Sequence, residues 1–195
     1  ENSRRFGISG IPRSAEDVAV AREILLAENE GVPVHIAHVS TRGSVQLIRE
    51  AKRRGVKVTA ETAPHYFTLT DDMLATRNAN FRMNPPLGDE SDRLAVIEGL
   101  RDGTLDVIAT DHAPHAPEEK ADFASAPNGV IGLETSLAVG ITTLVEPGLL
   151  SFTELIRKMS AAPASILGIP AGTLKPGAPA DLVLFHPTEQ WTVSP

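Results

Sequence analysis

The sequence contains no cysteine among its 195 residues. This absence excludes disulfide bonds, thiolate metal ligands and a cysteine nucleophile. Any metal bound by this chain must be held by histidine, aspartate or glutamate side chains. Six histidines and 25 acidic residues are available for that purpose.

Long apolar runs and a surplus of basic residues are also lacking. No stretch approaches the roughly 20 apolar residues of a membrane-spanning helix. The first residues, Glu1 to Arg5, precede no apolar segment of the kind found in secretory signals. We therefore expect a cytoplasmic protein with no membrane partner. The net charge of -7 argues against a nucleic-acid partner, because such surfaces carry clustered basic residues.

The chain alternates between predicted strands and predicted helices. Its hydrophobic content of 42% suffices for a buried core in one or at most two domains. Apolar runs typical of strands occur at 34–39, 57–61 and 105–111, and helical periodicity occurs at 14–25, 43–54 and 91–101. Ser14 and Asp17 fit a capping box at the first helix. This alternation predicts an α/β fold that forms part of a TIM-type (β/α)8 barrel, since about three of eight units are present.

Asp111 stands where the apolar run 105–109 meets a loop, and His112 and His115 follow it closely. Side chains alternate along a strand, so Asp111 shares the face of the odd-numbered residues in that run. A carboxylate at the interior end of a barrel strand suits catalysis. An aspartate can equally end a strand and cap the following turn, so this residue alone leaves both readings open.

Histidines and a glutamate stand at the ends of the two earlier strands. His35 and His38 are three residues apart and point to opposite faces, so His38 is the candidate ligand and His35 is expected to pack toward a helix. A lone strand-end histidine is more often a core residue, but imidazole and the Asp111 carboxylate are ligand types that zinc takes. Glu61 could orient a metal-bound histidine, whereas His65 is equally compatible with surface exposure.

Two loops offer groups for ligand recognition. Asn84 lies among prolines, which hold its amide rigidly enough to recognise another amide or a carboxylate. Asn128 and Gly129 form a turn by composition, and such a turn can also present backbone amides to a ligand.

Six motifs occur in order along the chain: HIAHVST, AETAPH, MNPPLG, DHAPH, EEK and NGVIGLET. In this combination the chain resembles the dihydroorotases of the amidohydrolase superfamily. The resemblance continues through SAAPASILGI and GTLKPGAPADLVLF, so it covers nearly the whole chain. DHAPH together with MNPPLG favours dihydroorotase over the related allantoinases and dihydropyrimidinases.

The resemblance implies a metal-dependent hydrolase with one or two zinc ions. His38 and Asp111 match metal ligands of that family, and Asp111 also matches the catalytic residue that handles the proton of the attacking hydroxide. The implied reaction is the reversible cyclisation of N-carbamoyl-L-aspartate to L-dihydroorotate in pyrimidine biosynthesis.

The resemblance also implies a small-molecule substrate held at both the ring and the carboxylate. The residues that match these substrate-binding positions are Asn84, His115, Asn128 and Gly129. His112 matches no ligand position and is expected to form hydrogen bonds near the site. We expect His112, Glu61 and His65 to contact the residues that bind metal or substrate and to hold them in place.

Several family elements have no counterpart in this sequence. They are the His-x-His pair of the first strand with the arginine that follows it, the carboxylate or carboxylated lysine of the fourth strand, and the histidine of the fifth. The chain thus resembles a C-terminal part, with 1–170 as a partial barrel of strands six to eight and 171–195 returning to a small β-rich domain. We expect it to be ordered only beside a missing N-terminal half. A homodimer or a complex with aspartate carbamoyltransferase is compatible with the resemblance.

Two alternative functions remain. One is a cyclic amidase of the hydantoinase or allantoinase type on the same scaffold, which the residues around DHAPH disfavour. The other is a non-catalytic dihydroorotase-like subunit that supports aspartate carbamoyltransferase. Retention of His38, Asp111, Asn84 and His115 argues against that second alternative.

Overall fold

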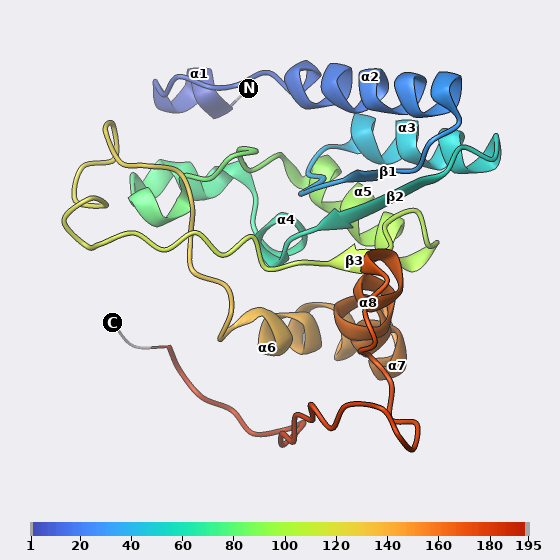
Figure 1. Ribbon diagram of the computed structural model, residues 1–195. Coiled ribbons are helices and arrows are strands. Elements are labelled where there is room, and N and C mark those ends of the chain that lie inside the picture. The colour runs from blue at the N-terminus through green and yellow to red at the C-terminus, as the bar shows by residue number, and fades with distance from the viewer. Residues whose placement is uncertain (1, 194–195) are drawn as a thin grey trace.

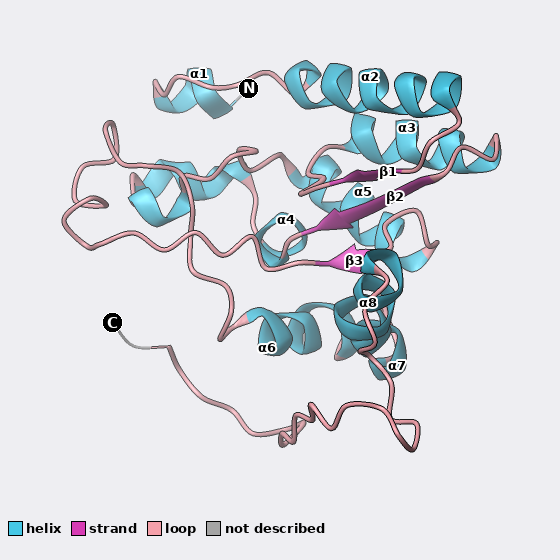
Figure 2. Cartoon of the chain, in the orientation of Figure 1, coloured by secondary structure: helices cyan, strands magenta, loops and turns pink. Residues whose placement is uncertain are grey.

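The protein is described by a computed structural model over residues 2–193, with a three-stranded parallel sheet at its centre (Figures 1 and 2). The strands β1 (Val34–Ile36), β2 (Val58–Thr62) and β3 (Val107–Ile108) lie side by side in that order. All pairing is parallel, with Val34 opposite Val58 and Thr62 opposite Ile108. Parallel neighbours require crossover connections, and helices provide them here.

Helices connect the strands and continue the chain beyond the sheet. They are α1 (Asn2–Phe6), α2 (Ser14–Glu30), α3 (Arg42–Arg53), α4 (Pro64–Thr68), η1 (Asp71–Thr76), η2 (Ala79–Phe81), α5 (Glu90–Arg101), α6 (Ser136–Gly140), η3 (Ile141–Val145), α7 (Phe152–Ile156), η4 (Arg157–Ala161) and α8 (Ala162–Leu167). Helix α3 packs between α2 and α5 (Figure 1). Within residues 2–193, no helix combines the length and apolar character needed to cross a membrane.

Strand β2 distinguishes the two faces of the sheet. Its residues alternate in burial: Val58, Ala60 and Thr62 are buried, whereas Thr59 and Glu61 are half-buried. The buried side chains join a core that includes fully buried residues of α3 and α5. One face of the sheet is therefore covered by helices, and the other carries polar groups.

The polar face also holds His35, which corrects the expectation that this residue packs toward a helix. Ile36 is the buried residue of β1, so the alternation of side chains turns His35 to the opposite face. There its Nδ1 lies 2.8 Å from Thr59 Oγ1 and its Nε2 lies 3.1 Å from Glu61 Oε2. Three polar residues of two strands thus interact across the uncovered face.

The predicted helices at 43–54 and 91–101 are confirmed within one residue by α3 and α5. The first helix is also present, but Ser14 is its first residue and not its cap. The carboxylate of Asp17 accepts a hydrogen bond from Thr41 Oγ1 at 2.6 Å, so it is used between elements and not in a capping box. The last predicted strand is shorter than expected, because it is regular only at Val107–Ile108.

The segment 169–193 contains neither helix nor strand. The apolar run 182–185 lies in the segment predicted to return to a β-rich domain, and it is exposed, with Val183 82% and Leu184 fully accessible. An isolated strand has no ladder partner and gains no stability in water. The boundary between the partial barrel at 1–170 and a β-rich segment at 171–195 stays a prediction.

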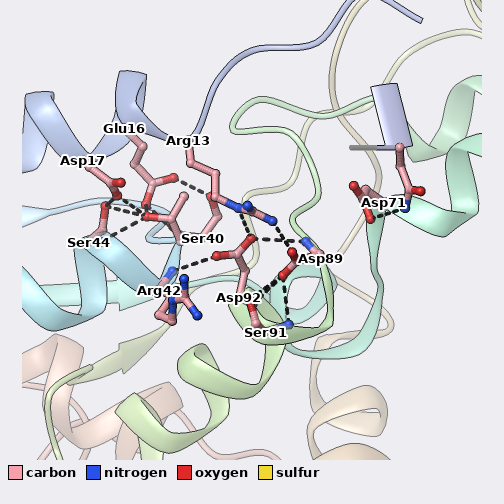
Figure 3. A network of polar contacts seen from close by, with 12 residues as sticks. Arg13, Glu16, Asp17, Ser40, Arg42, Ser44, Asp71, Asp89, Ser91 and Asp92 are labelled. Carbon is pink, nitrogen blue, oxygen red and sulfur yellow. Dashed lines mark hydrogen bonds and ion pairs between the residues drawn. The ribbon is translucent and has the colours of Figure 1, made fainter. Parts of the chain in front are cut away.

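Asp92 joins the N-terminal ends of three helices (Figure 3). It is only 1% exposed. Its Oδ2 lies 2.5 Å from Arg13 Nε before α2, and its Oδ1 accepts the Arg42 amide of α3 at 3.0 Å. The same carboxylate completes a capping box with Asp89 at the start of α5. One buried charge thereby organises α2, α3 and α5.

We expect Asp92→Asn to lower the free energy of unfolding by about 2 kcal/mol, because the amide leaves Arg13 and a backbone donor poorly paired. Glu98→Gln on the same helix is the matched control, since its exposed pair with Arg101 contributes less than about 1 kcal/mol. Urea unfolding of both variants measures the difference. Equal stability of the two would show that Asp92 does not organise these helices.

Candidate active site at the carboxyl ends of the strands

Three polar residues follow the three strands at their carboxyl ends. His38 comes soon after β1, His65 lies in α4 directly after β2, and Asp111 comes soon after β3. Parallel strands end at a common edge, so consecutive strand ends become neighbours in space. In α/β proteins this edge carries the ligand site.

His65 and Asp111 meet at this edge. The Nε2 atom of His65 lies 3.6 Å from Asp111 Oδ2. His65 is 7% exposed, which excludes the surface position left open by the sequence. Burial, followed by the nearby charge of His38, lowers the pKa of His65 to about 4. The imidazole is therefore neutral at pH 7, and its Nε2 has no hydrogen-bond partner among the described residues.

His38 and Asp111 share an uncommon backbone conformation. Their φ angles are 43° and 48°, in the left-handed region that non-glycine residues rarely occupy. Such conformations persist where surrounding contacts enforce them, and they cluster at functional sites. Here Val39, next to His38, donates its amide to Glu61 O at 2.8 Å and accepts at its carbonyl from Thr62 Oγ1 at 2.7 Å.

Glu16 of α2 holds the turn that follows His38 (Figure 3). Its Oε1 accepts the backbone amides of Ser40 at 3.0 Å and Thr41 at 3.1 Å, and its Oε2 accepts from the Ser40 hydroxyl. Sequence reasoning missed this role. Glu16 precedes its partners by more than twenty residues and lies in no recognisable motif, so only the packing of α2 against β1 reveals it.

Asn84 shares a groove with His38. The groove has a volume of about 1310 Å³ and is also lined by His35 and Pro85. Tyr66, beside His65, donates its hydroxyl hydrogen to Pro85 O at 2.8 Å, which connects α4 to the loop of Asn84. The candidate ligand His38 and the candidate recognition residue Asn84 are thus brought to one cavity.

His115, Asn128 and Gly129 form a second group of neighbouring residues. His115 Nε2 lies 3.0 Å from Asn128 O. Gly129 has a φ of 128°, and a Cβ at this position would stand 3.0 Å from Ala113 O and 3.3 Å from His115 Nε2, and closer still to Ala113 Cβ. Glycine is therefore required by both its backbone conformation and its close neighbours.

The supporting residues lie near the site in different ways. His112 Nδ1 accepts a hydrogen bond from the Gly132 amide at 3.0 Å, so His112 holds the loop after the Asn128 turn. Glu61 contacts His35 instead of His38, and its predicted role behind a metal-bound histidine stays a prediction. Among residues 2–193 no group of three or more histidine, aspartate or glutamate side chains is arranged to hold a metal ion. His38 and Asp111 can therefore contribute part of a ligand set.

Parallel strands that are covered by helices on one face and carry polar residues at their carboxyl ends are the arrangement found in α/β barrel enzymes, and this chain contains part of such an arrangement. The model of the Amidohydrolase family matches residues 2–194, and the chain belongs to that family. The predicted fold class is thereby confirmed.

Curated relatives and solved structures agree with this assignment. The chain is 56% identical to the dihydroorotase of Trichlorobacter lovleyi and 57% identical to that of Syntrophus aciditrophicus, over 98% and 99% of its length. It spans 45% of the length of each relative. It also superimposes on the L-hydantoinase (dihydropyrimidinase) from Arthrobacter aurescens, with a TM-score of 0.81 and 32% identity, covering 87% of this chain and 39% of that one. For the D-hydantoinase (dihydropyrimidinase) from Thermus sp. the TM-score is 0.81 and the identity 26%, covering 92% and 43%.

We expect Gly129→Ala to destabilise the loop of the second group more than a glycine substitution elsewhere, because the new methyl group would displace Ala113 or His115. Gly148→Ala is the matched control: its φ is also positive, at 75°, but nothing lies within 4 Å of its Cβ position. Backbone strain alone costs about 1–2 kcal/mol, and Gly129→Ala should exceed that loss. Thermal unfolding of both variants tests this, and equal losses would contradict the close contact.

Proposed function

We propose that this chain forms the C-terminal part of a dihydroorotase, which reversibly cyclises N-carbamoyl-L-aspartate to L-dihydroorotate in pyrimidine biosynthesis. The observation that carries the proposal is the 56–57% identity to dihydroorotases across almost the whole chain. The hydantoinases are more distant in sequence, at 26–32% identity. Because the chain spans less than half of its relatives, the remainder of the site would come from an N-terminal segment.

His38 and Asp111 would hold a zinc ion together with ligands from that segment. Imidazole and carboxylate are zinc ligands, and the strand-end position of both residues suits such a site. The buried, unpartnered Nε2 of His65 beside Asp111 supports this fit, since it leaves a polar group aimed at the same place. Bound zinc would lower the pKa of its water from 15.7 toward about 7 and polarise the ring carbonyl.

Asp111 would act as the catalytic acid and base. Its carboxylate would accept the proton of the attacking water and return it to the ring nitrogen that leaves. Asn84 would recognise the pyrimidine ring, and His115 with the turn of Asn128 and Gly129 would hold the ring and its carboxylate. Glu16 and His65 would keep the strand-end turns in place while this occurs.

Other aspects of the complete protein follow from the same proposal. Residues 1–170 would form part of the barrel and residues 171–195 part of a small β-rich domain. The N-terminal half of the same protein would complete both the barrel and the site. A cytoplasmic location, and a homodimer or a complex with aspartate carbamoyltransferase, remain predictions of the resemblance.

We expect Asp111→Asn in the full-length protein to lower kcat/KM for L-dihydroorotate by at least about 100-fold, because proton transfer by a positioned side chain contributes 10²–10⁴-fold. Asp106→Asn is the matched control, since Asp106 lies at the opposite end of β3 and binds Lys52. Its activity should stay within about threefold. Full activity in Asp111→Asn would refute the catalytic assignment.

A substrate panel separates the alternatives. Activity on L-dihydroorotate but not on hydantoin or dihydrouracil would support dihydroorotase. Activity on hydantoin alone would assign the protein to the cyclic amidases of the hydantoinase type. An inactive wild-type protein that binds aspartate carbamoyltransferase would instead be a non-catalytic subunit.

We expect Asn84→Ala and His115→Ala to raise KM for L-dihydroorotate by about tenfold or more, with a smaller change in kcat, since each removes a hydrogen-bonding group from the bound ring or carboxylate. Asn29→Ala, an exposed amide at the end of α2, is the control and should leave KM unchanged. Steady-state kinetics decides this. A loss of kcat with unchanged KM would contradict a binding role.

A further inference from the structure

Lys120 of the EEK motif holds three backbone carbonyl groups at once. Its Nζ donates to Ala79 O at 3.2 Å, to Pro127 O at 2.8 Å and to Gly129 O at 2.7 Å. An ammonium group has three donor hydrogens, so all of its donors are satisfied by these carbonyls. Burial, followed by the charge of Arg82, lowers the pKa of Lys120. The half-buried side chain thus places its ammonium group among backbone dipoles.

Arg82 makes the reciprocal contact from the other loop. Its Nη1 donates to Phe123 O at 2.6 Å and to Ala124 O at 2.7 Å, and its own carbonyl accepts the Gly129 amide at 2.8 Å. Lys120 belongs to the loop after β3, and Arg82 to the loop that carries Asn84. Arg82 thus binds the loop after β3, whereas Lys120 binds the other loop at Ala79 O and its own loop at Pro127 O and Gly129 O.

These contacts surround the two groups assigned above to substrate recognition. Lys120 holds the carbonyls on both sides of Asn128, and His115 contacts the Asn128 carbonyl itself. All three consecutive carbonyls of the turn are therefore bound within the protein. The amide of Asn128 makes no hydrogen bond among residues 2–193, so this turn can offer a backbone donor to an anionic group. Arg82 stands two residues before Asn84 and sets the start of its loop.

Building on the proposed function, we propose that Lys120, together with Arg82, is a positioning residue that fixes the spacing between Asn84 and the Asn128–Gly129 turn, and so determines the affinity for the substrate ring and carboxylate. Among residues 2–193, neither cation forms a hydrogen bond or ion pair with the candidate metal ligands His38 and Asp111. The effect should therefore fall on substrate binding and not on the metal.

Only an ammonium group of this length suits the position of Lys120. Methionine fills similar space but leaves three carbonyls without a donor, which loosens the turn. Arginine keeps the charge, yet its planar donors cannot converge on three carbonyls around one point. The experiments therefore test two properties of the Lys120 side chain, which are its ammonium charge and its length.

The first experiment compares Lys120→Met with wild type in the full-length protein loaded with zinc. We expect KM for L-dihydroorotate to rise about tenfold or more, kcat to stay within about threefold, and bound zinc to remain unchanged. Lys57→Met, an exposed lysine before β2, is the matched control and should behave like wild type. An active wild type with an unchanged KM in Lys120→Met would overturn the positioning role. An inactive wild type would instead contradict the proposed function.

The second experiment introduces one cysteine into this chain, which has none of its own, and treats the full-length wild type with the same reagents as the control for thiols elsewhere. Lys120→Cys can be alkylated with 2-bromoethylamine, which restores an ammonium at nearly the lysine length, or with 2-iodoethanol, which adds a neutral hydroxyl. We expect KM to recover with the aminoethyl group but not with the hydroxyethyl group. Equal recovery with both would show that packing alone matters and would refute the role of the charge.

A third variant approaches the same contact from the other loop. Arg82→Met removes the bonds to Phe123 O and Ala124 O while leaving Lys120 in place. We expect the same rise in KM with little change in kcat. An unchanged KM in Arg82→Met would show that the contacts between the two loops do not set substrate affinity, and it would contradict the proposal. This test remains available even if Lys120→Met proves too unstable to purify.

Discussion

The parallel pairing of three short strands is the constraint on which the rest of this structure depends. Backbone hydrogen bonds extend the pairing beyond the regular strands: Asp106 donates to Ala60 O at 2.8 Å, Ala109 to Thr62 O at 2.9 Å and Val39 to Glu61 O at 2.8 Å. These bonds carry the register to the very ends of the strands. The strand-end residues are therefore placed relative to one another by the backbone, before any side chain interacts.

Two carboxylates, one half-buried and one buried, then fix the parts of the structure that strand pairing does not constrain. The half-buried Glu16 binds the turn after His38, and the buried Asp92 joins the starts of three helices. A buried carboxylate is costly unless its oxygen atoms are fully hydrogen-bonded. Both carboxylates meet that condition with backbone amides, which ties helix packing to the geometry of the strand-end edge. The stability of the helices and the shape of the site thus rest on the same contacts.

The loops that would recognise substrate are organised differently from the strand ends. In the described part of the chain no strand joins the Asn84 loop to the Asn128 turn. The Gly129 amide donates to Arg82 O, the Arg82 side chain binds the loop after β3, and Lys120 binds Ala79 O together with two carbonyls of its own loop. Backbone carbonyl groups are the hydrogen-bond acceptors of both cations. The geometry of these loops therefore depends on two side chains and one backbone hydrogen bond, whereas that of the metal ligands depends on the sheet.

The sequence by itself determined the α/β alternation, the two central helices and the family, because apolar periodicity and ordered motifs are local properties of the chain. It also indicated Asp111, His38 and Asn84, since residues at strand ends and among prolines are visible in order along the chain. Only the tertiary structure decided that His65 is buried against Asp111 and that His35 turns to the polar face. The contacts of Glu16, Lys120 and Arg82 likewise join residues far apart in the sequence, and no local pattern encodes which distant carbonyl or carboxylate a side chain will meet.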